Sequence, residues 1–443
     1  MQGECIVMGK IKILCLTLVL LLSVTLLPKQ IDAEEFQVLA DAVILVDADS
    51  GKILYENKAN TPLGIAEMTK MMTAYLLLEA VEKGQLQWEQ EVMISDYTYA
   101  IAQHEGIRTV NLKKDVAYTV KALYEALVVY NANDAAIALA ELIAGNEADF
   151  IVLMNKKAKE LYLSGYKFVN ASGLNNSYLL GMHPAGTGAM DENVMSARSV
   201  AKLAYTMYKE YPDLLSVSMQ PKIMFNEGSP ESFPVTSWNR MLPGLEYGYN
   251  KVSGLFGGYT PFAGHSMVSF AERDGKRLIA VVMKAVDENG AESEQVMYAE
   301  MMKLLDYGFS NFDSVEILPA GYRVKGQESL FVIKGEQDEV AIETTQSITL
   351  MLRADEIDLY EPKLLLDMEY LEAPVEKGIV VGKLLLEHSE GKDYGFITGE
   401  ALLVDMITAD NVNNAGKTEL FFQGIKTFWQ VLWQEANRLI GND

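Results

Sequence analysis

Residues 44–73 have the sequence ILVDADSGKILYENKANTPLGIAEMTKMMT, and they contain two predicted elements. Two apolar, β-rich runs flank a polar segment that ends in glycine, so residues 42–57 are predicted to form a β-hairpin. The following residues, 66–81, are strongly apolar and rich in Met and Leu, and they are predicted to form a helix. This helix would carry Glu67 and Lys70 near its start.

Further along the chain, apolar residues recur at steps of three and four, which is typical of helices. Residues 120–143 contain two such runs, interrupted by the polar segment Asn131–Asp134. Additional helices are predicted at residues 149–162, 196–208 and 296–308.

Two regions have the shorter pattern of β-strands. Residues 266–285, SMVSFAERDGKRLIAVVMKA, form two β-rich runs joined at Arg273–Gly275, which predicts a second hairpin. From about residue 312 to residue 405 the chain consists of short β-rich runs separated by glycine turns. This change of character predicts a small all-β domain.

The composition is that of a globular protein with an acidic surface. The 443 residues are 49% hydrophobic and 22% charged, and the net charge is −24, which disfavours nucleic acid as a partner. Both cysteines, Cys5 and Cys15, lie in the N-terminal segment, so no disulfide or thiol nucleophile is expected. The histidines lack metal-motif spacing, and His183 and His265 are interpreted as structural; no metal or other cofactor is predicted.

The first 33 residues are typical of a secretory signal peptide. Lys10 and Lys12 precede the apolar run 13–27, Pro28 ends it, and cleavage is predicted after Ala33. The run is short for a membrane span, and an uncleaved anchor is the alternative. The mature chain is therefore expected on the outer side of the cytoplasmic membrane.

The C-terminal residues have a second targeting pattern. A polar linker begins at residue 411, and between residues 420 and 440 the apolar residues fall on one helical face. Trp429 and Trp433 widen this face, as expected for a helix that lies in a membrane interface. The alternative is a terminal helix docked on its own domain. We predict peripheral anchoring on the membrane surface through this helix.

Several stretches together resemble one protein family. Besides residues 44–73 they are NANDAAIALAELIAG (131–145), KFVNASGLNN (167–176), GMHPAGT (181–187), DENVMSAR (191–198), GLFGGYTPFAGHS (254–266) and AERDGKRLIAVVM (271–283). In order and spacing they resemble the low-molecular-mass penicillin-binding proteins that act as D-alanyl-D-alanine carboxypeptidases. The resemblance continues through APVEKGIVVGKL (373–384) and KDYGFI (392–397) into the amphipathic tail.

The resemblance implies an α+β fold, in which an antiparallel sheet is flanked by helices and joined to a helical subdomain. It also implies that a small all-β domain and an amphipathic C-terminal helix follow. With the signal peptide at 1–33, the predicted segments are a carboxypeptidase-like domain at 34–311, the β domain at 312–410, and the linker and anchor helix at 411–443. Family members remove the terminal D-alanine of peptidoglycan stem peptides through an acyl-enzyme.

The family's reaction uses the motifs S-x-x-K, S-x-N and K-T-G. The first falls on residues 67–70, where Lys70 is retained at the general-base position but Glu67 stands at the nucleophile position. A carboxylate has no hydroxyl that could be acylated. At this spacing Glu67 can form an ion pair with Lys70, which would favour protonated lysine and weaken it as a base. The structural interpretation is that a helix dipole favours Glu67 in the first turn.

The other two motifs are also changed. In the second, Asn131 replaces the serine that helps to move the proton, whereas Asn133 is retained at the substrate-contacting position. In the third, Phe256 and Gly257 replace the lysine and the threonine, and Gly258 is retained. Phe256 cannot pair with a substrate carboxylate, and its ring could occupy part of the cleft.

These changes predict a pseudoenzyme, since nucleophile, proton shuttle and carboxylate anchor are lost together. It would bind a peptidoglycan stem peptide, a cell-wall enzyme or a regulator through the old cleft or the β domain. Residual or altered hydrolase activity is the alternative, with Thr69, Glu67 or a loop serine such as Ser172 or Ser253 as nucleophile. A third possibility is a purely structural surface protein.

Overall fold

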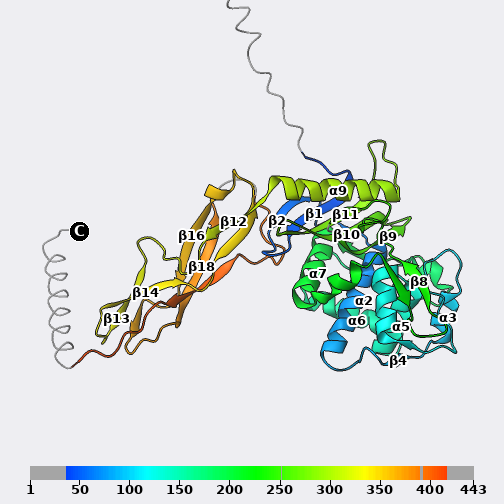
Figure 1. Ribbon diagram of the computed structural model, residues 1–443, viewed down its shortest axis with the longest axis horizontal. Coiled ribbons are helices and arrows are strands. Elements are labelled where there is room, and N and C mark those ends of the chain that lie inside the picture. The colour runs from blue at the N-terminus through cyan, green and yellow to red at the C-terminus, as the bar shows by residue number, and fades with distance from the viewer. Residues whose placement is uncertain (1–35, 251, 390–392, 417–443) are drawn as a thin grey trace, which may run out of the picture. The chain divides into compact units, whose positions relative to one another are not determined.

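The computed structural model describes residues 36–250, 252–389 and 393–416, which form a sheet-and-helix domain followed by a smaller β domain (Figure 1). The predicted α+β class is confirmed. The predicted signal peptide and anchor helix lie outside the described residues. Within those described ranges, no helix is both long enough and apolar enough to cross a lipid bilayer.

The sheet of the first domain has five antiparallel strands in the order β2-β1-β11-β10-β9. Both predicted hairpins are confirmed, as β1–β2 and as β10–β11, and β9 forms one edge of the sheet. The strands span β1 (Ala40–Asp47), β2 (Ile53–Asn57), β9 (Val252–Thr260), β10 (Gly264–Arg273) and β11 (Lys276–Ala285).

Two helices cover opposite faces of this sheet, α9 (Glu294–Asn311) and α7 (Ala197–Glu210) (Figure 1). Gly308 allows α9 to approach closely, because a Cβ atom there would lie only 2.7 Å from Leu278 and 2.8 Å from Leu45. Because helices cover both faces of the sheet, side chains on both sides of the central strands are buried. These strands are therefore almost continuously apolar.

A group of helices packs beside the sheet and forms the helical subdomain. Polar N-cap residues fix where several of them begin; for example, Thr119 and Asn146 each accept a hydrogen bond from the backbone N–H three residues later. The elements are η1 (Ala66–Thr69), α2 (Lys70–Glu82), α3 (Asp96–Ala102), α4 (Val120–Glu125), the π-helix η2 (Ala126–Tyr130), α5 (Asn133–Ala144), α6 (Glu147–Glu160), η3 (Asn176–Leu179) and α8 (Asp213–Ser218).

Three short ladders complete the first domain. Each has two antiparallel strands, which close the loops that surround the helices. They pair β3 (Pro62–Gly64) with β6 (Val194–Ser196), β4 (Glu91–Val92) with β5 (Tyr118–Thr119), and β7 (Lys222–Phe225) with β8 (Phe233–Thr236).

The second domain consists of β-strands around its own apolar core, as predicted. A six-stranded sheet has the order β16-β18-β19-β14-β13-β17, and β12 pairs with β15. The elements span β12 (Asp313–Leu318), β13 (Ser329–Ile333), β14 (Glu339–Thr344), β15 (Ile348–Leu352), η4 (Ile357–Leu359), β16 (Tyr360–Leu366), β17 (Tyr370–Glu372), β18 (Val380–His388) and β19 (Leu403–Thr408).

Candidate functional site

A cleft of about 390 Å³ lies between the edge strand β9 and the helical subdomain. Two of the predicted site positions do not line it: Lys70 is fully buried behind it, and Phe256 lies in the hydrophobic core. The predicted positions that line the cleft are Glu67, Asn131, Asn133, Gly257 and Gly258. The fold therefore brings residues from three distant stretches of sequence to one place.

Lys70 begins α2, and its ammonium group is held from two sides. Nζ donates to Oδ1 of Asn133 at 2.7 Å and to the backbone oxygen of Ser172 at 2.9 Å. Among the described residues, Lys70 and Glu67 do not form the ion pair that their spacing allows. Burial lowers the pKa of Lys70 to about 7, and this outweighs the negative charge of Glu67, which raises it. Glu67 thus acts on Lys70 in the expected direction, toward the protonated form, but burial has the larger effect.

Glu67 reaches across the cleft to the sheet. Its Oε2 accepts a hydrogen bond from the backbone N–H of Tyr259 at 3.1 Å, and it lies directly over Gly258. Burial raises the pKa of Glu67, whereas Lys70, Arg108 and two backbone N–H groups lower it. A carboxylate held by backbone N–H groups occupies the kind of site that stabilises an oxyanion in acyl transfer. Glu67 thus does more than interact favourably with a helix terminus.

Asn131 bonds to the same free edge of β9. It follows the π-helix η2 in the left-handed conformation, with φ of 63°, which asparagine adopts more readily than most residues. Its Nδ2 donates to the backbone oxygen of Gly257 at 2.9 Å. Its Oδ1 is buried and has no hydrogen-bond partner among the described residues.

Glu67 and Asn131 together close the free side of β9, and we call this pair the edge cap. An edge strand presents unpaired N–H and C=O groups to which an extended peptide can add. Here the C=O of Gly257 and the N–H of Tyr259 are already bonded, one to an amide and one to a carboxylate. The edge cap therefore supplies the donor and the acceptor that an added peptide strand would supply.

The third motif region offers no side chain that could hold a substrate carboxylate in place of the missing lysine and threonine. Sequence analysis left open whether the ring of Phe256 enters the cleft; Phe256 is 0% exposed and does not line the cleft. A Cβ atom at Gly257 would lie 2.6 Å from Cβ of Met267 and 2.9 Å from the ring of Trp238. A threonine at position 257 would therefore require its neighbours to move.

The alternative nucleophiles are buried and engaged in hydrogen bonds. Thr69 accepts from Nδ2 of Asn193 at 2.8 Å, Ser172 donates to Asn170, and Ser253 donates to the backbone oxygen of Phe270. None of the three hydroxyl groups lines the cleft. The geometry therefore offers no exposed hydroxyl beside Lys70 in these positions.

Sequence reasoning missed several residues that line the cleft. Arg108 is exposed at its rim, and its backbone oxygen accepts two hydrogen bonds from Asn133. Trp238, in the loop after β8, and Tyr178, in the short helix η3, also line the cleft, and neither belongs to one of the three motifs. Tyr259 also lines the cleft, and its position directly after the third motif could have indicated this from the sequence.

The two histidines have different surroundings. His183 is bonded within its loop, with Nδ1 3.0 Å from Oγ1 of Thr187. His265 lines the cleft and stacks on Tyr259 with ring centres 4.5 Å apart, and burial lowers its pKa. Within the ranges described, no group of three His, Cys, Asp or Glu residues could hold a metal ion.

The close approach of Glu67 to β9 predicts an energetic coupling. A Cβ atom at Gly258 would lie 1.7 Å from Oε2 of Glu67, so Gly258→Ala must expel the carboxylate from Tyr259. We expect Gly258→Ala to lower the free energy of unfolding by about 1–3 kcal/mol in the wild type, and by less beside Glu67→Ala, where only the contact of 3.1 Å with Cβ of residue 67 remains. Urea unfolding of both single variants and the double variant measures this coupling; equal costs in the two backgrounds would refute it.

Comparison with known proteins identifies the family. Residues 29–287 match the family model described as D-alanyl-D-alanine carboxypeptidase, peptidase S11. The chain belongs to the D-alanyl-D-alanine carboxypeptidase family. Residues 312–414 match a second model, the C-terminal domain of penicillin-binding protein 5.

Relatives in this carboxypeptidase family are similar over most of their length. D-alanyl-D-alanine carboxypeptidase DacF of Bacillus subtilis (strain 168) is 29% identical over 351 residues, which cover 79% of this chain and 81% of DacF. DacA of Escherichia coli (strain K12) is 28% identical over 357 residues, covering 80% and 79%. A crystal structure described as a peptidoglycan synthesis regulatory factor (PBP3) from Streptococcus pneumoniae is 32% identical with a TM-score of 0.72, covering 85% of this chain and 100% of that chain.

Proposed function

We propose that this member of the D-alanyl-D-alanine carboxypeptidase family is non-catalytic and acts by binding at the cell wall. The observation that carries the proposal is the position of Glu67. This residue stands where the family's motif has its nucleophile, and its carboxylate bonds to Tyr259 N–H across the cleft. A carboxylate in this place supplies no hydroxyl and fills the space above Gly258.

Three further features support the proposal. Asn131 cannot transfer a proton at ordinary pH, and its amide is engaged with Gly257. Phe256 supplies no cation for a substrate carboxylate. The lowered pKa of Lys70 is the one feature that favours catalysis, because it leaves a base available near neutral pH. A base alone does not complete the reaction, which also needs a nucleophile, a group that shuttles the proton and a group that holds the substrate carboxylate.

The cellular role we propose is regulatory. The family context places the protein in peptidoglycan metabolism. The similar Streptococcus pneumoniae structure is described as that of a peptidoglycan synthesis regulatory factor, which is consistent with a regulatory role here. We further propose secretion through the segment at 1–33 and anchoring through the segment at 411–443. The partner would be a stem peptide or a cell-wall enzyme.

Reaction with a penicillin tests the proposed inactivity, because an active member of this family is acylated on its serine. The full-length protein is incubated for many hours with a penicillin, beside an active family member, and the intact mass of each is measured. We expect an adduct on the active relative only. A stoichiometric adduct on the folded wild-type protein would overturn the proposal, and peptide mapping would identify the nucleophile.

A further inference from the structure

A second pocket, of about 610 Å³, lies beside the cleft and shares Tyr178 and Pro261 with it. This volume falls within the range of about 300–1,000 Å³ that is typical of ligand pockets. The pocket is lined by the loop that follows Asn175, by Lys167 and by the turn after β9. The edge cap closes the strand edge but not this pocket, because neither Glu67 nor Asn131 lines it.

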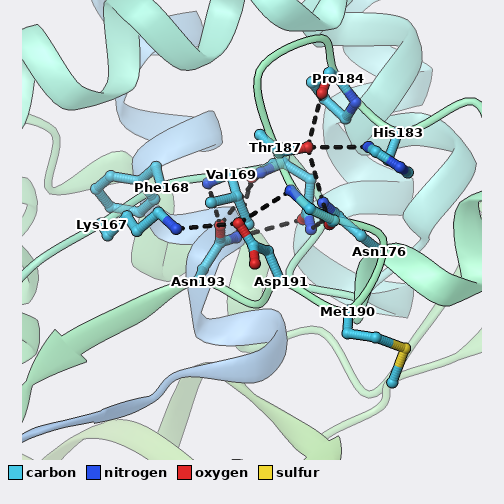
Figure 2. Close-up of polar contacts among 12 residues, drawn as sticks. Lys167, Phe168, Val169, Asn176, His183, Pro184, Thr187, Met190, Asp191 and Asn193 are labelled. Carbon is cyan, nitrogen blue, oxygen red and sulfur yellow. Dashed lines mark hydrogen bonds and ion pairs between the residues drawn. The ribbon is translucent and has the colours of Figure 1, made fainter.

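The loop that forms one wall of the pocket is fixed by its own hydrogen bonds. Figure 2 shows Asn176 and His183 both pointing toward Thr187. Asn176 is fully buried, and its Nδ2 donates to Thr187 Oγ1 at 2.9 Å and to the backbone oxygen of Gly188 at 2.8 Å. Thr187 in turn donates to the backbone oxygen of Pro184 at 2.7 Å. The wall is therefore formed before any ligand arrives.

The polar part of the pocket contains carboxylates that already have partners. Glu192 is 8% exposed, and its two oxygens accept from Nδ2 of Asn175 at 2.9 Å and from Oγ1 of Thr260 at 2.5 Å. Asp191 forms an ion pair with Lys167 at 3.0 Å. Carboxylate oxygens carry more lone pairs than these bonds use, so they can accept further hydrogen bonds from a ligand.

The apolar part of the pocket is exposed to solvent. Phe262 is 57% exposed, Met190 is 72% exposed and Tyr178 is 39% exposed. Exposed apolar side chains that gather around a hollow mark a binding site more often than scattered ones do. Two aromatic rings stand beside hydrogen-bond acceptors here, which suits a ligand with both C–H surfaces and hydroxyl groups.

We propose that this pocket binds a neutral glycan, namely a segment of N-acetylated amino-sugar units of the kind that form peptidoglycan strands. Sugar C–H faces would pack on Phe262 and Tyr178, and sugar hydroxyls would donate to Asp191 and Glu192. The net charge of −24 disfavours anionic polymers. Asp191 is already paired with the cation of Lys167, and Glu192 already accepts from two neutral donors, so a neutral ligand with hydroxyl donors matches these carboxylates. This assignment rests on the proposed function at the cell wall and names the ligand class.

Isothermal titration with a chitin hexasaccharide tests the assignment without any stem peptide. We expect the full-length protein to bind it, and Tyr178→Ala and Phe262→Ala to weaken binding by about tenfold each, as loss of a packed aromatic contact does. Phe331→Ala is the matched control, because Phe331 is 51% exposed on β13 in the other domain. Its affinity should equal that of the wild type. Thermal melts confirm that all variants are folded.

Each result supports or overturns the proposal. Absence of hexasaccharide binding by the wild type would overturn it, and so would an unchanged affinity in both aromatic variants. Binding of a D-Ala-D-Ala stem peptide that falls in these variants, with no glycan binding, would reassign the pocket to peptide. The penicillin experiment is independent: an adduct would overturn inactivity and leave the glycan result standing.

Discussion

Glu67→Ser should be acylated slowly by penicillin, whereas the wild type should form no adduct. The change supplies a hydroxyl close to Lys70, and it removes the carboxylate from Tyr259 N–H, which becomes free to hold the acyl oxygen. Since burial lowers the pKa of Lys70 to about 7, a large share of this lysine is neutral near pH 8 and can act as a base. Acylation should remain about 10²–10⁴-fold slower than in an active relative, because Asn131 shuttles no proton.

The rate at which Glu67→Ser forms this adduct should increase with pH. Neutral Lys70 is the active form, so the acylation rate should rise with pH and level off above the pKa of Lys70. Glu67 raises that pKa, and its removal should place the midpoint at or below about 7. Time courses of intact mass between pH 5 and pH 9 measure the profile.

Glu67→Ala is the matched control for this prediction. It empties the same space and frees the same N–H group but adds no nucleophile, so it should form no adduct. If Glu67→Ser also forms none while it is folded, Lys70 is not a competent base in this site. Hydrolysis of a D-Ala-D-Ala peptide should stay absent in Glu67→Ser, because Phe256 provides no carboxylate anchor.

Gly173→Ala should cost at least about 3 kcal/mol of unfolding free energy, or prevent folding. Gly173 has φ of +91°, and a Cβ atom there would lie 2.0 Å from the backbone oxygen of Ala66 and 2.8 Å from the backbone nitrogen of Glu67. The atoms in conflict are backbone atoms, so no side-chain rotation relieves them. The change would also displace Ser172, whose backbone oxygen accepts from Lys70.

Gly84→Ala separates the two sources of this cost. Gly84 also has a positive φ, +68°, but a Cβ atom there would meet nothing within 4 Å. Its replacement should therefore cost only about 1 kcal/mol, from backbone strain alone. Urea unfolding of the two variants measures the difference; similar costs would show that the contact with Ala66 is relieved easily.

Much of the fold could be predicted because its signals are local. The hairpins at 42–57 and 266–285 and the break at Asn131–Asp134 all follow from short-range patterns, and the structure has them. The helix expected at 66–81 is present but divided, because η1 ends at Thr69 and Ala66 has a positive φ of 42°. The backbone of Ala66 also lies close to Gly173, a long-range contact that no local pattern encodes.

The site was predicted as a set of residues but not as a set of contacts. Glu67 bonds to Tyr259, which lies 192 positions away, whereas sequence reasoning considered only local effects, namely the neighbour Lys70 and the helix dipole. The effect of Glu67 on the pKa of Lys70 has the predicted direction, but the larger, opposite effect of burial comes from distant residues that the sequence does not place beside Lys70. Sequence analysis left open whether the ring of Phe256 enters the cleft, and its place in the hydrophobic core depends on tertiary packing that no local pattern encodes.

The edge cap also bears on how the protein behaves in a crowded solution. An unpaired strand edge is a template on which another chain can form intermolecular sheet, and it promotes aggregation. In this protein Asn131 and Glu67 bond to β9, so two backbone groups of its free edge are protected from pairing with other chains.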